Sequence, residues 1–236
     1  MTLILSAATE EYVVQVSDRR LTWISDPKTG QTADDDSNKA VLFEHRMAFA
    51  YTGLAEVEGI RTDKWLTRVL ANANTGSLSE ACAVLRAGAT DAFRQMALSP
   101  DKKRHAFVGI GWTRRQVDEP FQPIIIEISN AQDEAGEWLE AAREEFKLSY
   151  RTWMQSENIL WKATGQRLDN QVRKTLERSL RTIVKKAPNP ESLARVLVKQ
   201  IRDIASKNIS VGQNLLVVSL PKRGIPTTPG HHGIPF

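Results

Sequence analysis

The residue with the clearest potential for chemistry is Thr2, which directly follows the initiator methionine. Methionine before a small residue is commonly removed, and the mature chain would then begin with a threonine. Such a residue carries a hydroxyl and a free α-amine, whose unperturbed pKa is about 7.7–8.0. The amine can take the hydroxyl proton without a histidine, which is one recognised way to activate a weak nucleophile. The sequence therefore suggests an N-terminal threonine nucleophile.

Other motifs that could indicate a catalytic or binding site are absent or weak in this sequence. The sequence holds no P-loop, no H-E-x-x-H, no paired C-x-x-C and no G-x-S-x-G. Gly109-Ile110-Gly111 lies inside a predicted strand with no helix after it, so it does not predict a dinucleotide site. His231 and His232 lie in a Pro/Gly-rich tail and are a weak sign of a metal, while His45 and His105 stand at strand ends without a visible partner. We therefore expect neither a metal nor a cofactor.

Composition and charge exclude several other classes of protein. The 236 residues are 41% hydrophobic and 25% charged, which rules out a collagen-like or largely disordered chain. The net charge of +4 is mild, and basic runs such as 102–104 are short, so solvated faces fit better than a nucleic-acid surface. No run of about 18 apolar residues predicts a membrane span, and the N-terminus lacks the layout of a signal peptide. The single cysteine, Cys82, cannot form an internal disulfide. We expect a cytoplasmic protein that binds neither nucleic acid nor membrane.

Hydrophobic periodicity predicts strands in clusters and helices in pairs. Alternating residues predict two hairpins within the first 53 residues, separated by a polar loop over 23–38. Helical spacing is predicted over 55–73, 78–97, 170–186 and 189–205. Further strands are predicted over 105–112, 123–128, 159–163 and 215–220. The stretch 133–156 is ambiguous, because 134–145 favours helix while 146–150 alternates.

This order of elements argues against a parallel βαβ sheet. It favours an α+β fold, namely a four-layer αββα sandwich in which two sheets pack face to face and helix pairs cover both outer sides. No linker divides the chain, so we expect one domain over residues 1–220. Residues 221–236 are expected to form an extended C-terminal tail.

From Thr2 to Gly53 the sequence resembles the β-type subunits of the proteasome family, including the bacterial ring peptidases. Those proteins have an N-terminal threonine and a hairpin whose second strand ends in Asp-x-Arg-x-Thr, which here is Asp18-Arg19-Arg20-Leu21-Thr22. The family then has a lysine at the start of the third strand and a glycine closing the fourth, here Lys39 and Gly53. Thr164-Gly165-Gln166 stands where the family has a Ser-Gly turn before the third helix. The resemblance implies the N-terminal-nucleophile hydrolase type of αββα sandwich.

The resemblance also implies a catalytic role for each matching residue. Thr2 would be the nucleophile, and Lys39 beside it would lower the pKa of its hydroxyl. Asp18 would pair with Lys39 and hold it in place. The backbone N–H of Gly53 would stabilise the oxyanion, and loss of such a donor typically costs about 3–4 kcal/mol. Thr164, in the turn before the third helix, would complete this part of the site.

Substrate would lie against the same segments of the chain. Thr22 and the Gly53 segment would bind the substrate main chain as an added strand. The resemblance also places residues around the primary pocket at Leu21, Val41, Tyr51 and Ala55. None of these is charged, so we expect a preference for neutral or apolar side chains.

The sequence departs from the family pattern in its last third. The family has Asp-x-x-Ser-Gly before the final strand, whereas this chain has Lys207-Asn208-Ile209-Ser210-Val211-Gly212. Ser210 matches the serine and joins the expected catalytic set. Lys207 or Asn208 replaces the acid, which leaves the orientation of the N-terminal amine without its usual support.

The function that the resemblance implies is a threonine peptidase that works in a homo-oligomer, either a ring or a spiral. Its substrate would be a peptide or an unfolded protein, and a separate ATPase would do any unfolding, because the chain has no ATP site of its own. A lone subunit is expected to expose apolar helix surface. Two alternatives stay open: a catalytically inactive structural or binding subunit, and an amidase of the wider N-terminal-nucleophile class.

Overall fold

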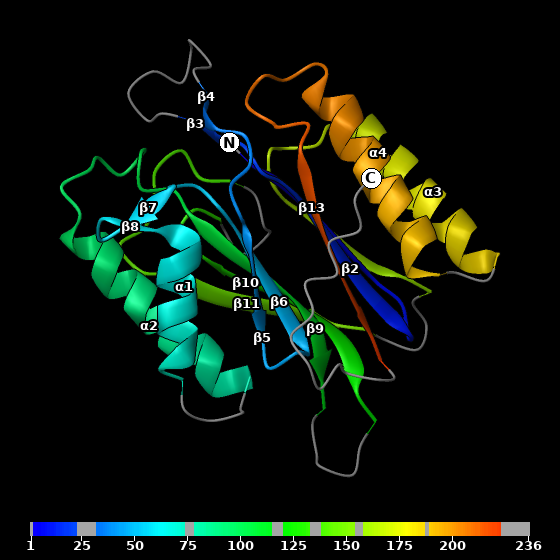
Figure 1. Ribbon diagram of the computed structural model, residues 1–236, viewed down its shortest axis with the longest axis horizontal. Coiled ribbons are helices and arrows are strands. Elements are labelled where there is room, and N and C mark those ends of the chain that lie inside the picture. Colours follow the sequence, from blue (N-terminus) through cyan, green and yellow to red (C-terminus); the bar gives the residue numbers. More distant parts are fainter. Residues whose placement is uncertain are drawn as a thin grey trace.

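The computed structural model describes residues 2–22, 32–73, 78–114, 120–132, 138–153, 158–186 and 189–222. Within these ranges, antiparallel sheets and separate helices build the molecule (Figure 1), which is the expected α+β class. The expected tail over 221–236 lies, from residue 223 onward, outside the described residues.

Two antiparallel sheets form the centre of the fold. The first has four strands in the order β12 (Leu160–Gly165), β1 (Leu3–Ala8), β2 (Tyr12–Asp18) and β13 (Leu215–Pro221). The second has five strands in the order β11 (Lys147–Thr152), β10 (Gln122–Ser129), β9 (Ala106–Thr113), β6 (Met47–Thr52) and β5 (Ala40–Phe43). Two short pairs are added by β3 (Leu21–Thr22) with β4 (Thr32–Asp34), and by β7 (Glu56–Val57) with β8 (Ile60–Arg61).

Three apolar clusters show how the helices and sheets are stacked. One cluster lies between the two sheets and joins Ile4 on β1 to Val108 on β9. A second packs the five-stranded sheet against α1 (Thr62–Ala71) and α2 (Leu78–Gln95). The third packs the four-stranded sheet against α3 (Asn170–Lys185) and α4 (Pro190–Ala205). Both sheets are therefore apolar on two faces, with one helix pair on each outer side (Figure 1).

The first hairpin explains how the chain begins in the interior. In β1 all six side chains are buried, because one face meets the other sheet and the other face meets α4. The register of β1 pairs Ile4 with Ser17 of β2 and with Thr164 of β12. The start of β1, and with it Thr2, is thus enclosed by strands from both ends of the sequence.

The helix predicted over 55–73 begins later than expected. Residues 56–61 form the β7–β8 pair, and its reversal uses Glu58 with φ 53° and Gly59 with φ 70°. The hydroxyl of Thr62 then donates to the Leu54 carbonyl at 2.8 Å, so the chain closes a loop before the helix starts. The prediction missed this loop because its few apolar residues also fit a helical spacing.

The helix favoured over 134–145 is wrong for the part that the structure describes, residues 138–145. There the backbone bonds back across the chain: the amide of Leu139 donates to the Ala131 carbonyl at 2.8 Å, and that of Arg143 to the Asn130 carbonyl at 2.7 Å. The polar loop over 23–38 also needs correction, since residues 32–34 form β4.

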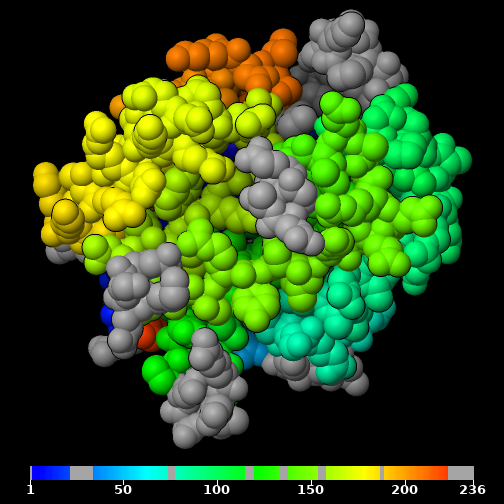
Figure 2. All heavy atoms as spheres, turned by 180° about the vertical axis from the view of Figure 1, so that it is seen from behind, coloured from blue at the N-terminus to red at the C-terminus, as the bar shows by residue number. Residues whose placement is uncertain are grey.

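The exposed apolar surface is not where it was expected. Among the described residues, the large apolar side chains that stand exposed are Leu42, Leu148, Tyr150 and Ile209, and none of them lies on a helix. Tyr150 is 66% exposed on β11, which forms an edge of the five-stranded sheet. Figure 2 shows this yellow-green part of the chain between α3, in yellow, and α2, in teal. No helix among the described residues is long and apolar enough to cross a membrane.

Candidate active site

Thr2, Lys39 and Asp18 meet at the start of β1. The ammonium of Lys39 donates to the hydroxyl oxygen of Thr2 at 2.5 Å and lies 3.5 Å from the Asp18 carboxylate. It also donates to the carbonyl of Arg20. An ammonium has three N–H donors, and here three oxygens surround it, so the charged form has an acceptor for each donor. This arrangement places a positive charge against the oxygen that would act as the nucleophile.

Burial makes this pair electrostatically strong. Lys39 is 1% exposed and Asp18 is 0% exposed. Burial lowers the pKa of Lys39 below its ordinary value, and the Asp18 carboxylate opposes that change. A charge held close to the Thr2 hydroxyl, away from water, favours the deprotonated oxygen more than the same charge would in solvent.

Asp18 also fixes the backbone on both sides of the site. Its Oδ2 accepts from the amide of Leu3 at 2.6 Å, and its Oδ1 accepts from the amide of Arg20 at 3.1 Å. Because Leu3 directly follows Thr2, the carboxylate holds the start of β1 as well as Lys39. Asp18 can do this from the end of β2, since β1 and β2 form one hairpin.

Strand β12 encloses Thr2 from the other side. The amide of Gln166 donates to the Thr2 carbonyl at 3.0 Å, and Leu3 pairs with Gly165. Gly165 has φ +97°, and a Cβ built on it would lie 1.8 Å from the Thr2 carbonyl oxygen. Only glycine therefore allows β12 to approach the start of β1 so closely.

Gly53 lies beside this group, at the end of β6. The hydroxyl of Thr52 donates to the Thr2 carbonyl at 3.4 Å, which places the Gly53 peptide next to Thr2. Gly53 is exposed and has φ +120°, and a Cβ there would lie 2.5 Å from the Arg104 carbonyl. A glycine is needed at this bend for both reasons.

His105 holds this bend in place, and sequence reasoning missed that role. Its Nδ1 accepts from the amide of Leu54 at 3.0 Å, directly after Gly53. The side chain is fully buried among aromatic rings, and burial lowers the pKa of His105 to about 3. The neutral ring with its proton on Nε2 fits this contact. Nothing in the sequence around His105 pointed to a partner 51 residues away.

Thr164 makes a contact that the sequence did not indicate. Its hydroxyl donates to Oε2 of Glu127 at 3.0 Å, and the ammonium of Lys162 lies 2.6 Å from the same oxygen. Glu127 is 2% exposed and comes from β10 in the other sheet. A lone glutamate in an apolar strand was the only signal available for it.

Ser210 lies in the loop before β13 and is bound within that loop. Its hydroxyl donates to Oδ1 of Asn208 at 2.7 Å, so an amide is its partner where the family pattern has a carboxylate. The carbonyl of Ile209 accepts from Arg20 at 2.7 Å. Since the Arg20 carbonyl accepts from Lys39, this loop is linked to the Thr2 group through Arg20.

Of the residues expected around the substrate, some are partly exposed and others are buried in the core. Leu21 and Ala55 are partly exposed, and Thr22 contributes backbone in β3. Val41 and Tyr51 lie on the side of the sheet that faces α1 and α2, in the apolar cluster. Tyr51 is 1% exposed and its ring stacks on His105 with centroids 6.0 Å apart. Burial raises the pKa of the Tyr51 hydroxyl.

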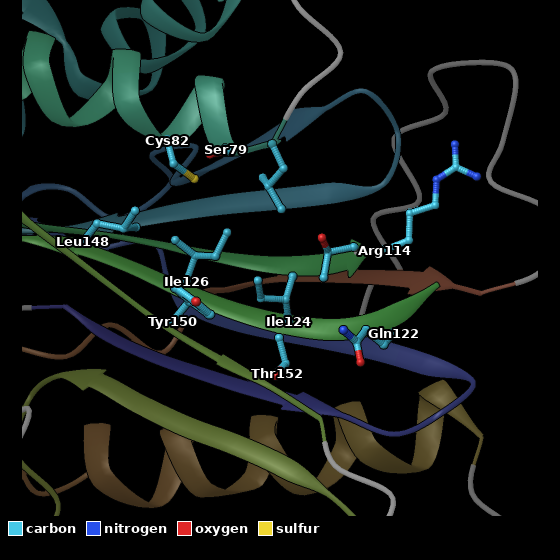
Figure 3. A pocket seen from close by; sticks show the side chains of 11 residues that line it. Ser79, Cys82, Arg114, Gln122, Ile124, Ile126, Leu148, Tyr150 and Thr152 are labelled. Atoms are coloured by element: carbon cyan, nitrogen blue, oxygen red, sulfur yellow. The ribbon is translucent and has the colours of Figure 1, made fainter. Parts of the chain in front are cut away.

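A hollow of about 340 Å³ lies elsewhere, on the face of the five-stranded sheet beneath the start of α2. Figure 3 shows Leu148, Ile126, Ile124 and Tyr150 along it, with Cys82 at its side. Burial raises the pKa of the Cys82 thiol to about 11, as fits a core residue. Among the residues that the structure describes, no group of three or more His, Cys, Asp or Glu side chains gathers as a metal site.

No family model matches this chain, and no curated protein matches it either. Among solved structures it is similar to eukaryotic HslV from Trypanosoma brucei, with 14% sequence identity and a TM-score of 0.48. The match covers 93% of this chain and 99% of that chain.

Proposed function

We propose that this protein is a threonine peptidase with an N-terminal-nucleophile fold of the proteasome β type. The observation that carries the proposal is the buried contact of 2.5 Å from the Lys39 ammonium to the Thr2 hydroxyl, with the Asp18 carboxylate beside it. Isolated buried charges are costly, so a lysine placed against a hydroxyl in this way is a candidate for a chemical role. Removal of Met1, which lies outside the described residues, would supply the missing base.

The proposed reaction uses groups of this chain alone. The Thr2 oxygen attacks the carbonyl carbon of a peptide bond, while its proton passes to the Thr2 α-amine. Charge on the carbonyl oxygen is met by the N–H of Gly53. The amine returns the proton to the leaving nitrogen as the C–N bond breaks, which leaves an ester on Thr2. Water then cleaves the ester, and the same amine acts as the base. In both steps the positive charge of Lys39 keeps the pKa of the Thr2 hydroxyl low.

The proposal extends to substrate and assembly. Neutral or apolar side chains are preferred, since Leu21 and Ala55, the partly exposed residues expected at the pocket, carry no charge. The chain works as a homo-oligomer on peptides or unfolded proteins, and a separate ATPase does any unfolding. We further propose that Thr164 and Ser210 belong to the site.

One observation favours the alternative of a catalytically inactive subunit. The loop at Ser210 offers the amide of Asn208 where a carboxylate would hold the N-terminal amine. An inactive subunit could keep the fold and its contacts without turning over any peptide. Whether the protein hydrolyses peptides therefore decides between the two functions.

The test is hydrolysis of a panel of fluorogenic peptides with neutral, basic and acidic residues before the scissile bond. The protein is prepared so that Thr2 is its first residue, and Thr2→Ala and Thr2→Ser variants are prepared in the same way. We expect Thr2→Ala to abolish turnover and Thr2→Ser to keep part of it. Thr175→Ala, an exposed threonine on α3, serves as the matched control and keeps full activity. Turnover that survives Thr2→Ala would refute the proposal.

A further inference from the structure

Glu127 is a buried carboxylate that the proposed reaction does not use. It lies on β10 and points into the space between the two sheets, where it is 2% exposed. One of its oxygens, Oε2, accepts from the Thr164 hydroxyl at 3.0 Å and lies 2.6 Å from the Lys162 ammonium. A carboxylate is kept in such a place only with partners, and here both partners come from β12 in the opposite sheet.

The register between β12 and β1 sets the position of Thr164 relative to the nucleophile, Thr2. Leu3 pairs with Gly165 and Ile4 with Thr164, so Thr2 and Thr164 flank the Leu3–Gly165 pair on one face of the sheet. That face is the one turned toward the other sheet, because Ile4 belongs to the cluster between the sheets. Thr2 and Thr164 are therefore diagonal neighbours across two antiparallel strands.

The Thr164 hydroxyl has one proton and could use it in two ways beside an α-amine. It could donate to the nitrogen lone pair, which would occupy the base, or it could accept an N–H and leave the lone pair free. The Thr164 hydroxyl donates its hydrogen bond to the Glu127 carboxylate, so the oxygen of Thr164 remains available as an acceptor. We propose that Glu127 is the positioning residue that fixes Thr164 as an acceptor for the Thr2 α-amine, a role that rests on the proposed function.

The surrounding charges are compatible with this role. Lys162 on β12 balances Glu127, and Lys39 is paired with Asp18 at the end of β2. The loop at Ser210 lacks the acid of the family pattern, and Glu127 supplies a carboxylate from the other sheet instead.

The experiment replaces the ion pair by apolar side chains, with Glu127→Met and Lys162→Met combined. Such a replacement commonly leaves the fold intact, because no buried charge is left alone. The first readout is the pKa of the Thr2 α-amine, followed by NMR in protein that starts at Thr2 and carries [15N]threonine. We expect the pKa to fall, because the released Thr164 hydroxyl then donates to the amine and favours its neutral form. Lys162→Arg keeps a positive charge beside Glu127 and with it the Glu127–Thr164 contact, and we expect no fall in that variant.

The second readout is hydrolysis of a fluorogenic peptide. We expect kcat of the double variant to fall roughly 10–100-fold with an unchanged KM, and the acid limb of the pH profile to move to lower pH. In a Thr164→Val background the same two changes should have no further effect, since Glu127 acts through Thr164. A full additional loss in that background, or an unchanged amine pKa, would overturn the proposal.

Two further results keep the outcome clear. If the double variant does not fold, Glu127→Asp decides, because it keeps the charge but withdraws it from Thr164. A several-fold lower kcat at constant KM then supports the role, and an unchanged kcat refutes it. If the wild-type protein hydrolyses nothing but its amine pKa responds as expected, the proposed function fails while the placement of Glu127 stands.

Discussion

At the scale of single residues, the account depends on Lys39 and Asp18, a buried pair that touches the proposed nucleophile. Replacing Lys39 by Met removes the charge beside the Thr2 oxygen and leaves the Asp18 carboxylate buried without its cation. We expect activity to fall by roughly 10²–10⁴-fold. Stability should fall by about 3–5 kcal/mol, as measured by urea unfolding.

A second substitution separates these two effects. Adding Asp18→Asn to Lys39→Met removes the unpaired charge, so part of the stability should return while the activity stays lost. The rest stays lost because Asn has one acceptor oxygen for the two backbone amides that Asp18 binds. Lys199→Met, an exposed lysine on α4, is the control and should change neither quantity. Full activity in Lys39→Met would show that the lysine has only a structural role.

His105 gives a prediction for pH. Its pKa is about 3 in the folded protein and about 6.5 in an unfolded chain. As the pH falls below 6.5, the unfolded chain binds a proton that the folded protein does not, so stability is lost down to about pH 3. The loss should approach 1.4 kcal/mol per pH unit.

The variant His105→Asn should lose the part of this pH dependence that His105 causes. Its amide oxygen can still accept from Leu54, but it does not titrate. We expect lower stability near pH 7, from lost packing, and a smaller loss between pH 6.5 and 3 than in the wild type. His45→Gln, a partly exposed histidine, is the control. Equal pH profiles for the wild type and His105→Asn, measured by urea unfolding, would contradict the assignment.

At the scale of elements, close approach of β12 to β1 positions the nucleophile. Gly165→Ala would force a Cβ against the Thr2 carbonyl and strain a backbone with φ +97°. We expect a loss of roughly 1–3 kcal/mol from the strain alone, together with reduced activity. The matched control is Gly88→Ala in α2, where the nearest atom would be 3.6 Å away, and helix propensity should stabilise the protein by about 0.5–1 kcal/mol. Similar thermal unfolding for the two variants would contradict this view of β12.

Elements with strong local signals could be predicted from the sequence. The helix that starts at Pro190 is an example, since Asn189 caps it and Ser192 completes a capping box. The start of α1 could not be predicted, because the β7–β8 reversal depends on positive φ at Glu58 and Gly59. Thr62 closes that reversal through a tertiary contact with Leu54.

The same distinction holds within the site. Thr2 could be proposed from its place after the initiator methionine, and Asp18 and Lys39 from the resemblance to proteasome β subunits, whose motif lies within the first two hairpins. Glu127 and His105 could not, since their partners lie on other strands far along the chain. Only the packing of the two sheets brings such residues together.

At the scale of the whole molecule, we expect a homo-oligomer. The exposed apolar side chains Leu148 and Tyr150 stand on β11, at an edge of the sheet, and sheet edges readily pair with other chains. Light scattering at micromolar concentration should report a mass several times the 26.5 kDa of one chain. A mass of one chain would contradict this expectation, although it would leave the chemistry of Thr2 untouched.

The chemistry also depends on where the whole chain begins. With Met1 attached, the Thr2 nitrogen is an amide and is no base near neutral pH. The same protein should therefore be inert with Met1 and reactive without it, even though Lys39, Asp18 and Gly53 are in place in both forms.

The most direct test treats both forms with an acylating peptide electrophile and maps the adduct by mass spectrometry. We predict one adduct per chain, on the Thr2 oxygen, in the form that starts at Thr2, and none in the form that keeps Met1. Equal labelling of the two forms, or labelling that persists in Thr2→Ala, would contradict an N-terminal threonine nucleophile.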